Sequence, residues 1–115
     1  MYKQRDILII PIPFTNLTAN KKRPVVVLSN DHYNNKAEDI VVIAVTSNIE
    51  RKEYSILISN QDLEEGVLPH QSIVRVDKIY TLNNSIVIKK LGVLRKETFK
   101  KVKDTLIKLI NQNIS

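Results

Sequence analysis

The sequence predicts a mostly β, α+β fold, in which a compact antiparallel, barrel-like sheet carries a C-terminal amphipathic helix. Three observations predict it. The 115 residues suffice for one hydrophobic core, so we expect a single domain spanning residues 1–115. Short β-branched runs follow one another with only polar or turn-forming residues between them. The apolar period then changes to that of a helix near the C-terminus.

The first half of the chain contains the clearest strands. Asp6–Pro13 alternates weakly and is rich in isoleucine, and a polar loop over Pro13–Lys22 follows it. Pro24–Ser29 is a continuous β-branched run whose proline stands at the first position, where a strand tolerates the missing donor. Asn30–Asn35 is polar and is expected to be a turn. Asp39–Thr46 is the strongest strand of the sequence.

The second half continues the strand pattern. Glu53–Ile58 predicts a short strand, and Asn60–Gly66 predicts a turn or short helix that ends at the glycine. Gln71–Leu82 alternates apolar and polar residues. Ser85–Leu94 predicts a last strand, and Asn83 and Asn84 just before it are typical of a tight hairpin connection.

The C-terminal segment predicts an amphipathic helix over Lys96–Gln112. Its apolar residues recur at helical spacing and leave the lysines on the other face. The apolar positions are Phe99, Val102, Leu106, Leu109 and Ile110.

Composition excludes several classes of function. The chain has no cysteine, which excludes disulfides, thiolate metal sites and a cysteine nucleophile, and its two histidines are too few for most metal sites. The longest apolar run, Ile7–Phe14, is far shorter than the ~18 residues of a membrane helix. No secretory signal is expected, so the cytoplasm is the default location. The sequence lacks the Walker loop, the dinucleotide-binding glycines, the metalloprotease helix and the hydrolase nucleophile elbow.

The chain is basic, with a formal net charge of +6 and a pI near 9.6. Cationic residues concentrate between Lys89 and Lys108, where Glu97 and Asp104 oppose them. A basic small domain favours polyanionic partners, either nucleic acid or an acidic protein segment. A solvated helix face that keeps the protein soluble is the simpler interpretation, and charge alone slightly favours it.

A few polar residues stand where strands begin or end. Arg23 lies between a polar loop and a buried strand, where a guanidinium can hold a phosphate bidentately. Thr46 and Ser47 end the most apolar strand, where their hydroxyls can donate to a phosphate or orient a ribose hydroxyl. Each taken alone is better explained as a surface arginine or as ordinary strand termination.

Ser72–Ile79 is the third polar cluster. Alternation places Arg75 and Asp77 on one face of a strand and Lys78 on the other. A cross-strand ion pair is the ordinary explanation, and a positive edge for a nucleic-acid backbone is the functional one. His32 and His70 have no catalytic partner nearby in the sequence, and we assign both to the structure or the surface.

Four blocks of this sequence, in order and over nearly the whole chain, resemble the MazF/PemK toxin family. The first runs from Asp6 through the loop to Arg23-Pro24 and ends at Asn30. The others are Asp39–Ser47, Ser72–Leu82 and Leu91–Leu94 followed by a helix.

The resemblance implies the compact SH3-like barrel of these toxins (CcdB/PemK-like) with a C-terminal helix. It implies a sequence-specific, metal-independent endoribonuclease without a cofactor, acting on single-stranded RNA and paired with an acidic antitoxin, and a homodimer. Arg23 matches the family's catalytic arginine and Thr46 its catalytic threonine. With Ser47 from the argument above, the residues expected to contact RNA are Phe14, Thr15, Asn16, Lys21, Lys22, Ser47, Ser72 and Lys78.

Two departures from the family pattern stand out. Arg5 replaces the usual glycine before the first aspartate, and the loop Asn16–Lys22 lacks the carboxylate that some members carry, so the identity of the general base is open.

Two other functions compete with the ribonuclease. One is a CcdB-like toxin that binds gyrase without cleaving RNA, although the tail after Ile110 lacks the expected aromatic ending. The other is a non-catalytic RNA-binding domain.

Overall fold

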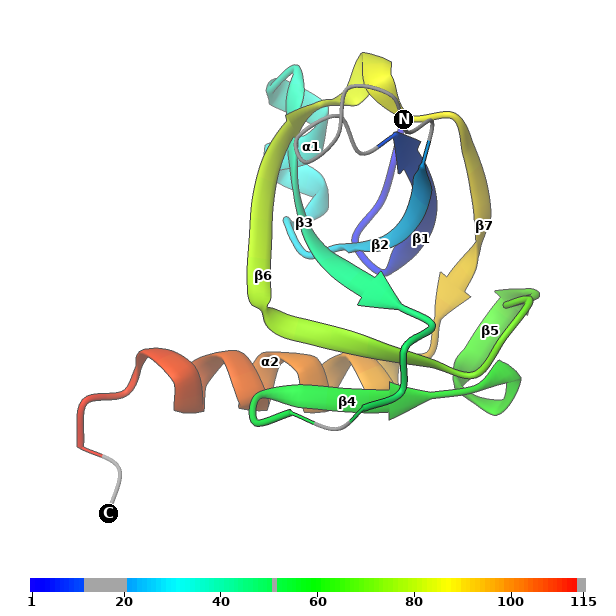
Figure 1. Ribbon diagram of the computed structural model, residues 1–115. Helices are drawn as coiled ribbons and strands as arrows, with labels where there is room; N and C mark the ends of the chain where they lie inside the picture. Colours follow the sequence, from blue (N-terminus) through cyan, green and yellow to red (C-terminus); the bar gives the residue numbers. More distant parts are fainter. Residues whose placement is uncertain (12–20, 51, 114–115) are drawn as a thin grey trace.

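The computed structural model describes residues 1–11, 21–50 and 52–113. Within these residues, seven strands form one antiparallel sheet that curls into a half-barrel, in the order β4-β6-β3-β2-β1-β7-β5 (Figure 1). The strands are β1 (Asp6–Pro11), β2 (Lys22–Val27), β3 (Asp39–Thr46), β4 (Ser55–Ile58), β5 (Leu63–Gly66), β6 (Ser72–Asn83) and β7 (Lys89–Leu94). The helices are α1 (Asp31–Lys36) and α2 (Lys96–Ile110), with the 3₁₀ turns η1 (Asn60–Asp62) and η2 (Asn84–Ile86). The expected barrel with a C-terminal helix is confirmed.

The central strands β1, β2 and β3 are buried on both faces. Side chains that alternate along a strand point to opposite faces, and here the two sets enter two different apolar clusters. Ile7, paired with Val26, belongs to the cluster that also packs against α2. Leu8, paired with Val25, belongs to the second cluster on the other face. This double burial explains why the strand sequences read as continuous β-branched runs.

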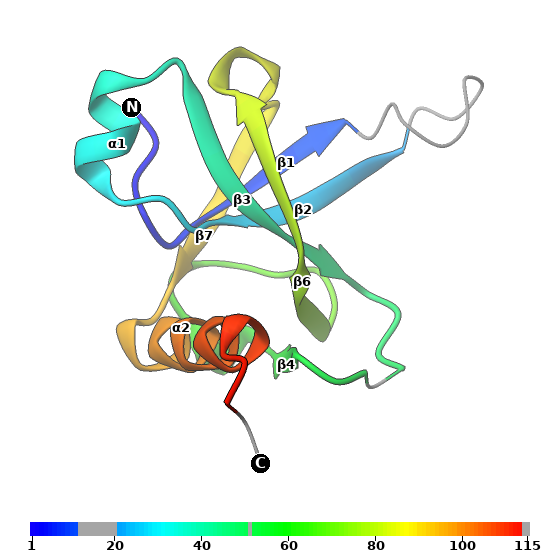
Figure 2. The ribbon, with the colours of Figure 1, turned by 90° about the vertical axis from the view of Figure 1, so that its left-hand side faces the viewer.

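The α2 helix covers the open side of the half-barrel. Its apolar stripe packs Phe99 and Val102 into the first cluster, and both side chains are buried. The helix lies against β4 and the adjoining part of β6 (Figure 2). It begins at the expected residue and ends two residues before the expected Gln112. The described part of the chain contains no helix with the length and apolar character that a membrane crossing requires.

A sharp bend divides β6 into two parts. Ile43 of β3 pairs with Ile79, but the next residue, Ala44, pairs with Arg75, so the ladder skips residues 76–78. The first part of β6 pairs with β4 as well as with the end of β3. The second part runs back along the start of β3, which makes the corner visible in Figure 1. Such a bulge bends a strand and redirects its side chains.

The polar segment Asn30–Asn35, expected to be a turn, forms α1 instead. The side chain of Asn30 caps this helix by accepting the backbone N–H of Tyr33 at 2.8 Å. Asn34 is fully buried, and its amide donates to the Ser29 carbonyl at 2.9 Å. The helix is therefore held by capping and a buried amide rather than by an apolar stripe.

The connections after β4 and β6 also differ from the expectation. Asn60–Gly66, expected to be a turn or short helix, forms η1 and then the edge strand β5. The hairpin expected at Asn83-Asn84 is wrong, because Asn83 caps η2 by accepting the Ser85 N–H at 2.9 Å. The chain then crosses the barrel, and β7 pairs with β1 and β5 rather than with β6.

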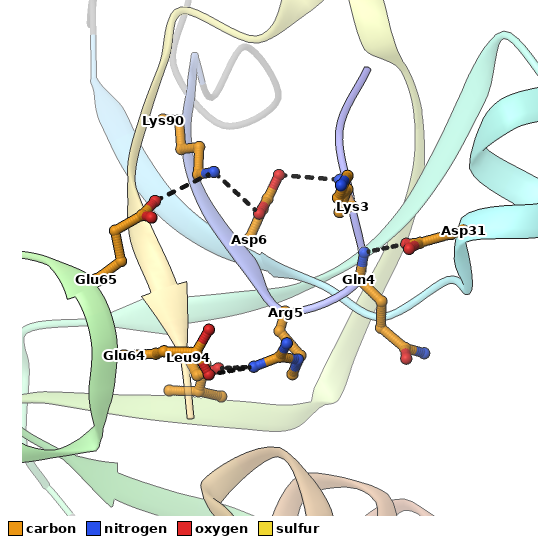
Figure 3. A network of polar contacts seen from close by, with 9 residues as sticks. All are labelled: Lys3, Gln4, Arg5, Asp6, Asp31, Glu64, Glu65, Lys90 and Leu94. Carbon is orange, nitrogen blue, oxygen red and sulfur yellow. Dashed lines mark hydrogen bonds and ion pairs between the residues drawn. The ribbon is translucent and has the colours of Figure 1, made fainter. Parts of the chain in front are cut away.

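A polar network fixes the start of β1 (Figure 3). Arg5 has a left-handed backbone (φ 78°), and its guanidinium donates to the Leu94 carbonyl at 2.9 Å and to Glu64 at 3.1 Å. The buried carboxylate of Asp6 accepts the Lys3 N–H at 2.9 Å and lies 3.5 Å from the Lys90 ammonium. The network joins β1 to β5 and β7 and so closes this side of the sheet.

Candidate functional site

The fold brings Arg23 and Thr46 together at the ends of adjacent strands. Val25 of β2 pairs with Ala44 of β3. Continuing this antiparallel register by two residues places Arg23 opposite Thr46. Both side chains are partly exposed and line one cavity of about 310 Å³, which we call the Thr46 cavity. Two residues that are far apart in the sequence thus form one site.

A hydrogen bond from the backbone holds the hydroxyl of Thr46 in place and leaves its proton free to be donated. Thr46 Oγ1 accepts the backbone N–H of Asn48 at 3.1 Å. A hydroxyl that accepts through its oxygen still has a proton to donate, so Thr46 can offer that proton to an anion in the cavity. Asn48, also at the cavity, accepts the Glu50 N–H at 3.3 Å and so holds Glu50 close to the site.

The bend of β6 places two cations at the Thr46 cavity. Arg75 and Lys78 both line it, although alternation predicted them on opposite faces. That part of the prediction is wrong because the ladder skips residues 76–78. The predicted Arg75–Asp77 pair is confirmed, with two bonds of 3.1 and 3.0 Å. Lys78 is exposed at the cavity, and together with the hydrogen bond from Arg75 its positive charge lowers the pKa of Asp77.

The ion pair between Arg75 and Asp77 shifts the pKa values of both residues. The hydrogen bond from Arg75 holds the pKa of Asp77 below its ordinary value. The same bond raises the pKa of Arg75. The two hydrogen bonds to Asp77 orient the Arg75 guanidinium.

A second cavity, of about 350 Å³, adjoins the first beside the start of β2 and the end of β3. We call it the Ser72 cavity, since Ser72 lines it together with Lys21, Lys22, Ser47 and His70. Neighbouring residues of β3 and its end divide between the two cavities, with Thr46 in one and Ser47 in the other. Pro24 and Val45 line both cavities, so the two cavities adjoin each other. Arg23 lines both.

The Ser72 hydroxyl is already engaged. Ser72 is 4% exposed and donates to the His70 carbonyl at 2.9 Å. This bond fixes the backbone of His70, a residue expected to belong to the structure or the surface. His70 is indeed exposed, but it shares a cavity with Arg23. No motif in the sequence marks it, because the contact depends on the path of the chain between β5 and β6.

The predicted site residues thus fall into three groups. The Thr46 cavity has Arg23, Thr46 and Lys78, and the Ser72 cavity has Arg23, Lys21, Lys22, Ser47 and Ser72. The expected RNA contacts Phe14, Thr15 and Asn16 lie outside the described residues. Among the described side chains, no group of three or more histidines and carboxylates is placed to hold a metal ion.

A family model matches nearly the whole chain. It is described as a PemK-like, MazF-like toxin of type II toxin-antitoxin systems, and it matches residues 3–110. Curated protein sequences give no match.

Solved structures share the fold at low sequence identity. An endoribonuclease in complex with its cognate antitoxin, from a mycobacterial species, is 16% identical with a TM-score of 0.80, and the match covers 100% of both chains. MazF from Deinococcus radiodurans is 18% identical with a TM-score of 0.75, over 95% of this chain and 96% of that one. A MazE–MazF structure from the same organism is 19% identical with a TM-score of 0.76, over 95% of each chain.

Proposed function

Because this chain belongs to the PemK-like, MazF-like toxins of type II toxin–antitoxin systems, we propose that it is a sequence-specific endoribonuclease. Its substrate is single-stranded RNA, and cleavage of mRNA inhibits translation and growth. It works without a metal or cofactor, as a single toxin domain in the cytoplasm. Similar folds in proteins described as an endoribonuclease and as MazF support this proposal.

One observation carries the proposal: Arg23 and Thr46 line the same cavity, with Lys78 beside them. In the proposed reaction the ribose 2′-oxygen attacks phosphorus in line and the 5′-oxygen leaves. The products are a 2′,3′-cyclic phosphate and a 5′-hydroxyl. Arg23 stabilises the charge on the non-bridging oxygens, and Thr46 donates a hydrogen bond to the same group.

Other residues bind the RNA strand on either side of that phosphate. Lys78 holds a phosphate from the Thr46 cavity, and Lys21, Lys22 and Ser47 do so from the Ser72 cavity. Ser72 positions the backbone of His70 through its hydrogen bond. Phe14, Thr15 and Asn16 remain expected RNA contacts.

We also propose two protein partners. A solved MazE–MazF structure and an endoribonuclease bound to its antitoxin share this fold. The formal charge of +6 complements an acidic antitoxin segment, which would cover Arg23. A second copy of the chain forms a homodimer, and light scattering at micromolar concentration tests this directly.

The function is tested by incubating the purified protein with a long RNA in EDTA and identifying the ends of the products. We expect internal cuts at a recurring short sequence, with cyclic phosphate and 5′-hydroxyl ends. Arg23→Ala should lower the rate by about a thousandfold or more, and Thr46→Val by roughly a hundredfold, because each removes a donor to the developing charge. Both variants should melt close to the wild type.

Other outcomes identify the competing functions. RNA binding without cleavage indicates a non-catalytic RNA-binding domain. Neither binding nor cleavage, together with inhibition of gyrase, indicates a CcdB-like toxin. Full activity in a folded Arg23→Ala variant would refute the assigned role of this arginine.

A further inference from the structure

The two cavities lie where an in-line reaction needs its proton-transfer groups. Attack and departure occur at opposite ends of the phosphorus, so the group that takes the 2′-proton and the group that protonates the 5′-oxygen must stand on opposite sides of it. Arg23 lines both cavities and therefore lies between them. If the non-bridging oxygens contact Arg23, the two reacting oxygens point toward different cavities. This reasoning rests on the proposed function.

The two cavities contain different proton-transfer groups. The Thr46 cavity has the carboxylate of Glu50 and the cations Arg23, Lys52, Arg75 and Lys78. The Lys52 ammonium lies 3.7 Å from the Glu50 carboxylate. An ionised carboxylate can accept a proton but has none to give. The Thr46 cavity is therefore the side from which the 2′-hydroxyl loses its proton.

The Ser72 cavity offers a proton donor instead. Its imidazole is His70, and its charged groups are the cations Lys21, Lys22 and Arg23. No carboxylate belongs to the described residues that line it. A cationic surrounding stabilises negative charge on a departing oxygen, and imidazole is the side chain suited to proton transfer near neutral pH.

The backbone holds His70 firmly at this cavity. Two residues earlier, buried Leu68 is fixed by Asn60, whose side chain accepts the Leu68 N–H at 2.7 Å and donates to the Leu68 carbonyl at 3.2 Å. Two residues later, buried Ser72 donates to the His70 carbonyl at 2.9 Å. These bonds hold the backbone of His70 at the wall of the Ser72 cavity, from which the imidazole can reach a group bound beside Arg23.

We infer that His70 and Glu50 carry the two protons of the cleavage reaction. The 2′-oxygen forms its bond to phosphorus while its proton passes to the Glu50 carboxylate. The bond from phosphorus to the 5′-oxygen breaks, and the His70 imidazolium gives its proton to that oxygen. Exchange with water then returns both groups to their starting states.

The test compares two RNA substrates in EDTA: an ordinary cleavable oligonucleotide, and the same oligonucleotide with sulfur in place of the scissile 5′-oxygen. A thiolate leaves without being protonated, so the second substrate does not need a proton donor. His70→Gln should slow cleavage of ordinary RNA by about a hundredfold or more and leave the sulfur substrate within about threefold of the wild type. Glu50→Gln should slow both substrates.

His32→Gln is the matched control, because His32 is also exposed but lies on α1, away from both cavities. It should cleave both substrates at the wild-type rate. His70→Asn serves as a second variant, and thermal melting confirms that each variant is folded. Equal losses on both substrates in the His70 variants, or no loss, would overturn the inference. Failure of the wild type to cleave either substrate, by contrast, would overturn the proposed ribonuclease itself.

Discussion

At the scale of single residues, Arg5 shows how a side chain can offset an unfavourable backbone. Its left-handed φ of 78° suits glycine, the residue that the family resemblance leads one to expect there. The guanidinium compensates by donating to the Leu94 carbonyl and to Glu64, and the Arg5 N–H donates to the Val27 carbonyl at 3.0 Å. The departure from the family pattern therefore has a structural explanation.

We predict that Arg5→Ala lowers the free energy of unfolding by about 1–3 kcal/mol, because it keeps the left-handed backbone and removes the hydrogen bonds of the guanidinium. Arg5→Gly loses the same bonds but relieves the backbone, so it should be more stable than Arg5→Ala by about 1 kcal/mol. Urea denaturation of the three proteins measures both differences. An alanine variant as stable as the glycine variant would contradict this account.

The Arg75–Asp77 pair predicts a pH dependence. The hydrogen bond from Arg75 lowers the pKa of Asp77 in the folded protein. A lowered pKa adds stability above the ordinary carboxylate range, and this contribution disappears as the pH falls through the folded value. Because the Asp77 side chain is 35% exposed, the effect should be about 1 kcal/mol or less. The melting temperatures of the wild type and Asp77→Asn should differ at pH 7 and converge in acid, and a constant gap would contradict the assignment.

At the scale of secondary structure, the elements that could be predicted were those with a strong local pattern. Asp39–Thr46 and the start of α2 match the sequence prediction, because a β-branched run and a helical apolar stripe each depend on neighbouring residues. α1 was missed because its stability comes from the Asn30 cap and the buried Asn34. β7 was given the wrong partner because strand pairing depends on distant residues.

The same distinction applies to the site. Arg23 and Thr46 stand at the limits of recognisable strands, but the family resemblance rather than that placement singled them out as catalytic. The place of Lys78 depends on a bend in β6 that no local pattern reveals, and that of His70 depends on the turn held by Asn60 and Ser72. Lys78 was expected at the site only through the family resemblance, and His70, which tertiary contacts position, was missed.

The junction of β5 and β7 tolerates only glycine. Gly66 pairs with Gly92, and a Cβ added at Gly92 would lie 2.2 Å from the Glu65 carbonyl oxygen. We predict that Gly92→Ala pushes β5 away and lowers the free energy of unfolding by about 1–3 kcal/mol. Compared with the wild type, the variant should show faster amide hydrogen exchange in β5 and unchanged exchange in β3. Unchanged exchange in β5 would show that the strand can move to accept the methyl group.

At the scale of the whole molecule, the positive charge divides into two regions with different expected roles. Lys21, Lys22 and Lys78 line the cavities around Arg23, whereas Lys101 lies on the exposed face of α2. The sequence alone slightly favoured a solvated helix face for the α2 lysines, and their place outside both cavities agrees with that interpretation.

Salt dependence of RNA binding separates the two regions. We predict that Lys78→Ala reduces the magnitude of the negative slope of log affinity against log salt by about 1, because it removes one phosphate contact. Lys101→Ala should leave the slope unchanged. The measurement uses an RNA with methylated 2′-hydroxyls, which this chemistry cannot cleave. Equal losses of slope in both variants would show that α2 also carries the RNA.

Arg23 stands at the boundary of both cavities, and this has a consequence for inhibition. An inhibitor does not have to fill both cavities to block the proposed activity. One carboxylate bound to the Arg23 guanidinium would neutralise its charge. It would also obstruct the access of RNA to both cavities. We therefore expect a short acidic peptide with one carboxylate at Arg23 to inhibit the protein.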